Sequence, residues 1–256
     1  MQYSATTAVR RHPGWRPQLR LPGLGRFIGN KNNLVGAAIL LPIVVLAFTA
    51  PWLPIADPLK PDIMASLDAP SAEHPFGTDK LGRDIFSRTL AGLRVSLFVG
   101  FSAAGLALAG GMIIGTIAGF MGKTVDAVIS AIVDVFLAFP SLLLAIAVVA
   151  IFGPGIPQVI AALAISDIPR AIRLQRSLTL GLKTRTYMDA ARMASAPTSW
   201  ILVKHILPNT VAPMVVVASI YASNAILAEA ALSFLGLGLV DRKSTRLNSS
   251  HITISY

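Results

Sequence analysis

The sequence has no cysteine and little charge, and both deficits narrow the possible classes of protein. Without cysteine, disulfides, thiolate catalysis and cysteine-based metal sites are excluded. The four histidines are scattered, so we expect no metal site. Charged residues make up 13% of the chain and apolar residues 54%, whereas soluble domains average about 25% charged residues. A soluble protein is therefore a poor explanation of this composition.

Long stretches without any ionisable side chain point to a membrane protein. Residues 32–56, 95–122 and 135–166 have none, and a membrane-spanning helix needs about 20 mostly apolar residues. The sequence thus predicts an all-α, polytopic transmembrane helical bundle without a separate soluble domain. The five predicted spans are residues 34–50, 96–121, 127–151, a short one from 158 to about 168, and 208–234.

The net charge is +10, and the basic residues are concentrated in the segments that flank these apolar runs. Residues 1–31 carry six bases and no acid, and residues 170–204 carry seven bases against Asp189 alone. The connection 51–88 instead has six acids and four bases. Because cytoplasmic loops collect Lys and Arg, we expect the N-terminus and the basic loop in the cytoplasm and the acidic loop outside. This pattern indicates a lipid bilayer as partner and no nucleic acid.

These features divide the chain into five predicted segments. Residues 1–31 form a basic cytoplasmic arm, 32–56 a first transmembrane helix and 57–91 an external loop. Residues 92–240 form a transmembrane domain that contains a cytoplasmic loop at 170–208. Residues 241–256 differ in character and are treated below.

Three glycines spaced four residues apart line one face of the second predicted span. Gly111, Gly115 and Gly119 let another helix approach closely. Packing within the subunit is the favoured interpretation, and a seam against a partner subunit is the alternative.

The basic cytoplasmic loop is typical of two short helices joined by a turn. Residues 187–194 favour a helix, and Ser195 or Ala196 can end it and cap the next one, with Pro197 in its first turn. The paired Ala190 and Ala191 make a low-relief surface that is suited to insertion into a partner's groove.

This loop resembles the coupling loop of ATP-binding-cassette (ABC) importer permeases. Asp189, Ala190 and Ala191 match the acidic-Ala-Ala positions, Ser195 stands where the family has glycine, and Leu207-Pro208 matches the end of the pattern. The resemblance implies that the loop docks on an ATPase subunit. The residues it assigns to this role are Tyr187, Asp189, Ala190, Ala191, Arg192, Ser195, His205, Leu207 and Pro208.

Three further segments resemble the dipeptide, oligopeptide and nickel branch of these permeases, and the basic arm with a single helix before them is similar to the second permease of that branch. They are residues 74–88, 134–141 and 229–238. The external motif within the first comprises Gly77, Thr78, Asp79, Gly82, Arg83 and Asp84. It is either a structural turn or a contact to the binding protein or gate.

The resemblance implies a transport subunit in the bacterial inner membrane and not an enzyme. Expected partners are a sister permease, two cytoplasmic ATPases that hydrolyse ATP, and a periplasmic substrate-binding protein. No catalytic residue or cofactor is expected. Dipeptides, longer peptides, glutathione, nickel chelates and sugars all stay open as solutes. The alternatives are an ion-driven secondary transporter, for which no inverted repeat is visible, and a membrane scaffold, which leaves the coupling loop unexplained.

Two acids lie within predicted spans, where a charge costs about 2.5–3.5 kcal/mol on insertion scales. Asp134 is near the cytoplasmic end of its span, so snorkelling, helix capping and solute contact all stay open. Glu229 is near the outer end of its span and either pairs with Arg83 or Arg94 or lines the pathway.

The last sixteen residues, 241–256, are polar and lack helical periodicity. They resemble one reading frame of a DNA-sequencing adapter, and a natural polar tail is the alternative. Permeases of this branch have a sixth span after the Gly236-Leu237-Gly238 turn. We therefore expect residues 241–256 to be non-native and the sixth span to be missing from this sequence.

Overall fold

The computed structural model describes residues 31–53 and 55–238. The predicted arm, apart from Lys31, and the adapter-like residues 241–256 lie outside the described residues. The chain divides into two compact units, Met1–Thr49 and Ala50–Tyr256. In the first unit, α2 (Lys31–Thr49) is apolar along its length and contains Pro42, which membrane helices tolerate. The stretch Asn33–Trp52 is long and apolar enough to cross a membrane, as predicted.

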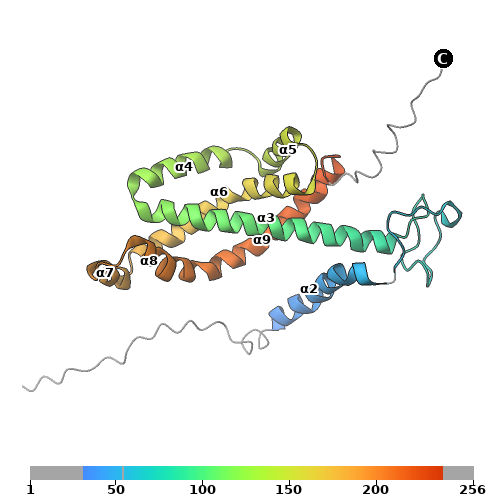
Figure 1. Ribbon diagram of the computed structural model, residues 1–256, viewed down its shortest axis with the longest axis horizontal. Coiled ribbons are helices and arrows are strands. Elements are labelled where there is room, and N and C mark those ends of the chain that lie inside the picture. The colour runs from blue at the N-terminus through green and yellow to red at the C-terminus, as the bar shows by residue number, and fades with distance from the viewer. Residues whose placement is uncertain (1–30, 54, 239–256) are drawn as a thin grey trace, which may run out of the picture. The chain divides into compact units, whose positions relative to one another are not determined.

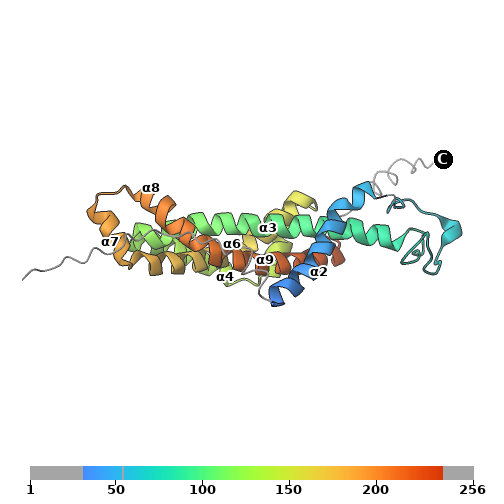
Figure 2. The ribbon, with the colours of Figure 1, turned by 90° about the horizontal axis from the view of Figure 1, so that it is seen from below.

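The second unit is a helical bundle, drawn in Figures 1 and 2. Its centre is α3 (Ile85–Met121), which packs along both α6 (Ile156–Lys183) and α9 (Leu207–Phe234). Its remaining elements are the short 3₁₀ turns Ala50–Trp52 and Ile63–Ala65, α4 (Lys123–Leu137), α5 (Ser141–Phe152), α7 (Thr186–Met193), α8 (Thr198–Ile201) and the π-helical turn Leu202–Ile206. Across residues 31–53 and 55–238 the only strand-like pairing is an isolated bridge between Thr78 and Asp84. The all-α membrane fold is confirmed.

The glycine face of α3 packs against α6 of the same chain. A Cβ atom on Gly111 would lie 2.3 Å from Ala171 Cβ, and one on Gly115 would lie 2.6 Å from the Ile172 carbonyl oxygen. A Cβ atom on Gly119 would lie 2.8 Å from Thr179 Cβ. Real Cβ atoms do not approach other atoms so closely, so α3 and α6 can touch only where these side chains are missing. The interpretation as packing within the subunit is confirmed.

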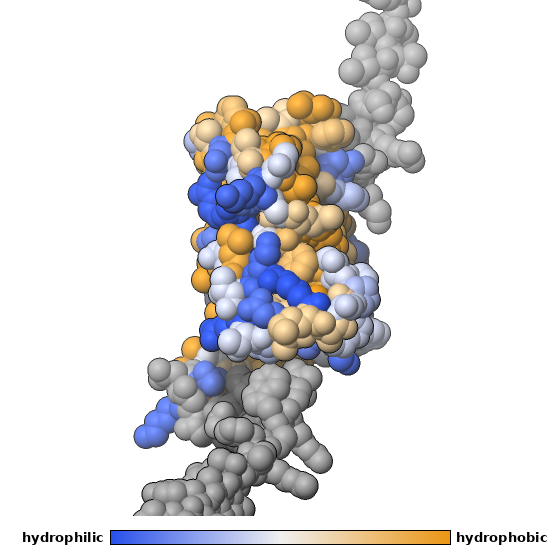
Figure 3. Space-filling view, turned by 90° about the vertical axis from the view of Figure 1, so that its left-hand side faces the viewer, coloured by the Kyte–Doolittle hydropathy of each residue, from blue (hydrophilic) through white to orange (hydrophobic). Residues whose placement is uncertain are grey.

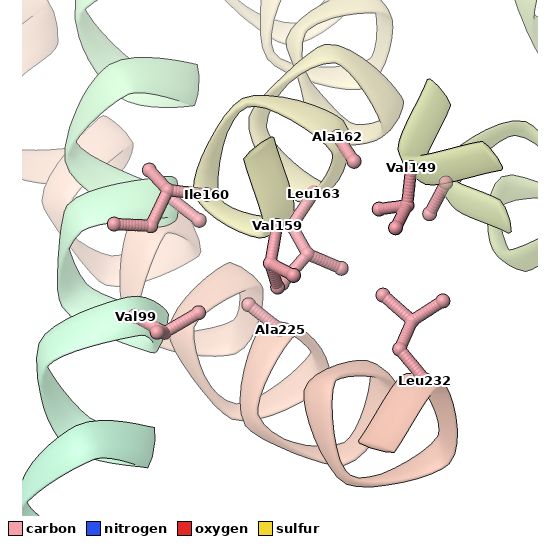
Figure 4. Close-up of a cluster of buried hydrophobic side chains, with 10 residues drawn as sticks. Val99, Val149, Val159, Ile160, Ala162, Leu163, Ala225 and Leu232 are labelled. Atoms are coloured by element: carbon pink, nitrogen blue, oxygen red, sulfur yellow. The ribbon is translucent and has the colours of Figure 1, made fainter. Parts of the chain in front are cut away.

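Apolar side chains from four helices fill the space beside this contact, as Figure 4 shows. Val99 of α3 and Val149 of α5 are fully buried, and Val159 of α6 and Leu232 of α9 belong to the same cluster.

A buried side-chain amide farther along α6 makes the packing of the three long helices more specific. Gln175 donates from Nε2 to Thr116 Oγ1 (2.8 Å) on α3 and to Thr210 Oγ1 (3.0 Å) on α9. A buried polar group is costly unless it is paired, so this contact favours one register of the three helices.

The third predicted span, residues 127–151, is not one straight helix. α4 and α5 meet at an angle of 87°. Pro140 stands directly before α5, where it lacks an N–H and disfavours helical geometry in the residue before it. The described residues contain three stretches long and apolar enough to span a membrane, or four if the bent pair counts as one. The short fourth span, predicted from 158 to about 168, lies within α6, which is not one of these stretches.

Two predicted boundaries are also wrong. α3 begins at Ile85, inside the predicted external loop 57–91, because Asp84 accepts a hydrogen bond from the Ser87 N–H (2.7 Å) and so caps the helix. α6 continues to Lys183, so the predicted loop 170–208 starts in the middle of a helix. The true connection between α6 and α9 is 184–206. The fifth span, predicted at 208–234, agrees with α9 to one residue.

We predict that Gly115→Ala destabilises the bundle by about 1–3 kcal/mol, the usual cost of forcing extra atoms into a packed interior. The measurement is the thermal midpoint of the detergent-solubilised protein, followed by the fraction that stays monodisperse. Gly105→Ala is the matched control on the same helix, because a Cβ atom there meets nothing within 4 Å. An equal midpoint for the two variants would contradict the packing argument.

Candidate functional site

The predicted coupling loop is a compact hairpin with its own small core. Met188, Ile201 and Ile206 are buried there and pack against Phe120 of α3 and Leu182 of α6. The Lys183 ammonium donates to the Phe120 carbonyl oxygen (3.0 Å) and lies over the Phe120 ring. The hairpin is therefore attached to the end of the α3–α6 pair.

The turn of the hairpin depends on the position where the ABC importer pattern has glycine. Ser195 has φ +55°, a left-handed conformation that favours glycine. Its N–H donates to the Arg192 carbonyl (2.9 Å), and the Ala196 N–H donates to the Ala191 carbonyl (3.2 Å). These two bonds are the Schellman ending of a helix. The prediction that Ser195 or Ala196 caps the next helix is wrong, because Pro197 is the N-cap residue of α8.

The two alanines of the motif face different ways. Ala190 is exposed beside Asp189, which pairs with Arg192 at 3.1 Å. Ala191 is half-buried and packs on the hairpin core. Of the two alanines expected to face a partner's groove, Ala190 is thus the more exposed. Met193 was missed by the sequence reasoning, and it is 86% exposed next to this surface.

The remaining motif residues hold the hairpin to α9. The His205 ring lies between Tyr187 (centroids 6.0 Å apart) and Trp200 (4.8 Å). The side chain of Asn209 donates to the His205 carbonyl (2.6 Å). Leu207 and Pro208 form the first turn of α9, where a missing N–H costs nothing. Figure 3 looks at this end of the molecule and shows hydrophilic residues gathered among exposed hydrophobic ones.

The external motif is built as a hydrogen-bonded turn. Gly77 (φ +72°) and Gly82 (φ +70°) cannot be replaced, because a Cβ atom would lie 2.5 Å from the Asp68 carbonyl oxygen and 1.6 Å from that of Asp62, respectively. Thr78 accepts from the Asp68 N–H (2.8 Å) and donates to the Ala65 carbonyl. The glycines and Thr78 are therefore used within the loop itself.

The carboxylate of Asp79 is the centre of this loop. It accepts from the Arg83 guanidinium (2.9 Å) and the Leu81 N–H (2.8 Å), and it pairs with Arg88. Burial raises the pKa of Asp79, but the hydrogen bonds from Arg83 and Leu81 outweigh it and hold the pKa at about 2 instead of 3.8. Because the folded pKa is depressed, this stabilisation is present above pH 3.8 and is lost as the pH falls through about 2.

Asp84 joins the loop to the first turn of α3. It accepts from the Ser87 hydroxyl (2.6 Å) and lies 3.2 Å from His74 Nδ1. Burial raises the pKa of Asp84, but the hydrogen bonds from Ser87 and His74 outweigh it and lower the pKa overall. The loop and the hairpin thus lie at opposite ends of α3, whose 37 residues span about 55 Å. That length exceeds the roughly 30 Å of bilayer hydrocarbon.

The two intramembrane acids chosen from the sequence have ordinary partners. Asp134 pairs with Arg173 at 2.5 Å, and both side chains are exposed. Glu229 is buried and accepts from the Ser96 hydroxyl (2.9 Å). The predicted pairing of Glu229 with Arg83 or Arg94 is wrong for Arg83, which pairs with Asp79, and the observed partner is Ser96.

The sequence reasoning missed a third acid, Asp167, which is 7% exposed in the middle of α6. It pairs with Arg170 at 2.8 Å. The sequence signal that could have identified this pair is an acid followed three residues later by a base, directly after an apolar stretch. It also missed the Asp126–Arg176 pair between α4 and α6. Within the described residues no cluster of three or more metal-binding side chains occurs.

Comparison with known proteins matches this arrangement to one family. The family described as "Binding-protein-dependent transport system inner membrane component" matches residues 111–251, a range that includes the glycine face, the hairpin and α9. The chain belongs to this family. It is an inner-membrane permease.

Relatives of this permease carry names of peptide transport systems. A dipeptide transport system permease protein of Alkalihalophilus pseudofirmus is 44% identical over 82% of this chain and 69% of its own length. An oligopeptide transport system permease protein of Bacillus subtilis is 39% identical over 84% of this chain and 70% of its own length. A probable D,D-dipeptide permease of Escherichia coli is 38% identical over 82% and 70%, respectively.

We predict that Ser195→Gly stabilises the hairpin turn by about 1 kcal/mol, because glycine removes the cost of a left-handed conformation. Hydrogen exchange of the amides in residues 186–206 should slow. Ser195→Val should have the opposite effect, since a β-branched residue tolerates this conformation worst. Faster exchange in the glycine variant would argue against the turn as described.

Proposed function

We propose that this chain is a permease subunit of an ATP-driven importer that moves peptides or related small solutes across the bacterial inner membrane. The observation that carries the proposal is the hairpin 184–206, a packed helical unit attached to the end of α3 and α6. An exposed Ala190 flanked by Asp189 and Met193 offers a low surface with a projecting apolar side chain. Such a unit can enter a groove on a partner.

The partners follow from the two ends of the bundle. Two cytoplasmic ATPases bind and hydrolyse ATP, and one of them receives the hairpin. A periplasmic binding protein delivers solute at the side of loop 57–84, and a sister permease completes the pore. The N-terminus is then cytoplasmic. The names of the relatives support peptides as the solute class.

The orientation can be tested by labelling single cysteines, because the chain has none of its own. We expect Ser71→Cys, exposed in the outer loop, to react with a membrane-impermeant reagent in intact spheroplasts. Thr184→Cys, exposed beside the hairpin, should react only after the inner face is opened. Labelling of Thr184→Cys in intact spheroplasts would reverse the topology.

The coupling role can be tested with one substitution at three positions of the assembled transporter. Ala190→Trp should leave the permease inserted and paired with its sister subunit but reduce solute-stimulated ATP hydrolysis at least about tenfold, since interface anchors are commonly worth 2 kcal/mol or more. Ala191→Trp should instead destabilise the hairpin, because its side chain packs on the hairpin core. The matched control is Ala38→Trp, exposed on the apolar helix α2 and away from both proposed docking surfaces.

Equal hydrolysis in Ala190→Trp and Ala38→Trp would refute the coupling role. Uptake that continues without the ATPases and responds to an ion gradient would favour the secondary-transporter alternative.

A further inference from the structure

A cavity of about 390 Å³ lies between α5, α6 and α9. Its apolar wall includes Leu163 and Ala225, which belong to the packed cluster in Figure 4. This wall is therefore held in place by the core. The polar residues that line the cavity are Ser141, Ser166, Asp167, Arg170, Tyr221 and Asn224.

Asp167 lies in the part of α6 that the sequence predicts to enter the membrane, and Arg170 follows three residues later. Asp167 is the twelfth of 28 residues in α6, about 17 Å from the start of the helix, and the hydrocarbon core is roughly 30 Å thick. Ionisable groups at such depth are expensive, and they usually face a water-filled cavity on a solute or ion pathway. Asp167 is 7% exposed, whereas the Arg170 side chain is 44% exposed and reaches into the cavity.

The other acid–base pairs of α6 differ from this one. Asp134 and Arg173 are 64% and 59% exposed and line a separate hollow. Asp126 and Arg176 make two hydrogen bonds that tie α4 to α6. The Asp167–Arg170 pair instead lines a cavity at the start of α5, where the Ser166 hydroxyl lies 3.2 Å from the Ser141 carbonyl oxygen.

We propose that this cavity is a subsite for a zwitterionic solute, namely a short peptide with free termini. The Asp167 carboxylate takes the terminal ammonium, and the Arg170 guanidinium takes the terminal carboxylate with its fork of N–H donors. The pair is neutral overall, so it matches a neutral zwitterion better than a metal cation or an uncharged sugar. The volume is at the lower end of small-molecule sites. This inference rests on the proposed function and selects among its solutes.

The test uses the complete transporter in liposomes, with the full-length form of this permease, its sister permease, the ATPases and the binding protein. The probe is L-alanyl-L-alanine, and both its uptake and the ATP hydrolysis stimulated by loaded binding protein are measured. We expect Asp167→Asn and Arg170→Gln to lower uptake about tenfold, the effect of losing one charge-assisted hydrogen bond. Stimulated hydrolysis should be unchanged, and Asp167→Glu should restore part of the uptake.

Arg173→Gln is the matched control, one turn farther along α6 and outside this cavity. It should change uptake by less than about twofold, because exposed ion pairs contribute little. Equal uptake in Asp167→Asn and Arg173→Gln would overturn the subsite. A parallel fall of uptake and hydrolysis in Asp167→Asn, without rescue by Asp167→Glu, would assign a merely structural role and overturn it too. Absence of ATP-dependent uptake in the unaltered transporter would instead overturn the proposed function and, with it, the subsite.

Discussion

The close approach of α3 and α6 is the constraint on which the rest of this bundle depends. Three glycines of α3 place no side-chain atoms of their own between the two helices, so the α3 backbone directly contacts backbone and side-chain atoms of α6. In lipid, where apolar side chains gain little by leaving one apolar environment for another, such close packing is the main source of helix association. The contact fixes the spacing at which α9 and α5 can add their own apolar faces.

The hairpin uses the end of that pair as its base. Phe120 is the penultimate residue of α3, and Lys183 is the last residue of α6. The Lys183 side chain donates a hydrogen bond to the Phe120 carbonyl oxygen. The hairpin is therefore in contact with the ends of both helices. The buried Gln175 contact to Thr116 and Thr210 extends the same connection to α9. Continuous contacts thus link the hairpin to the three helices α3, α6 and α9, two of which line the cavity.

The loop 57–84 is constrained differently, by charge and backbone geometry instead of apolar packing. The ionised Asp79 carboxylate gathers Arg83, Arg88 and two backbone N–H groups, while Gly77 and Gly82 let two chain segments touch. A loop of this kind keeps its shape in water without a large core. A preformed surface of fixed shape lowers the ordering cost when a second protein binds.

The amino-acid sequence by itself determined the membrane class, the α9 span and the importance of the glycine face. These features are local or periodic, so composition, helical spacing and backbone sterics are enough to predict them. Tertiary structure alone decided which alanine faces outward, that residues 127–151 break at Pro140, and that Glu229 pairs with Ser96, 133 residues away. It also decided that Asp167 lines a cavity, because a cavity exists only between helices that are distant in sequence and its lining depends on how those helices rotate against one another.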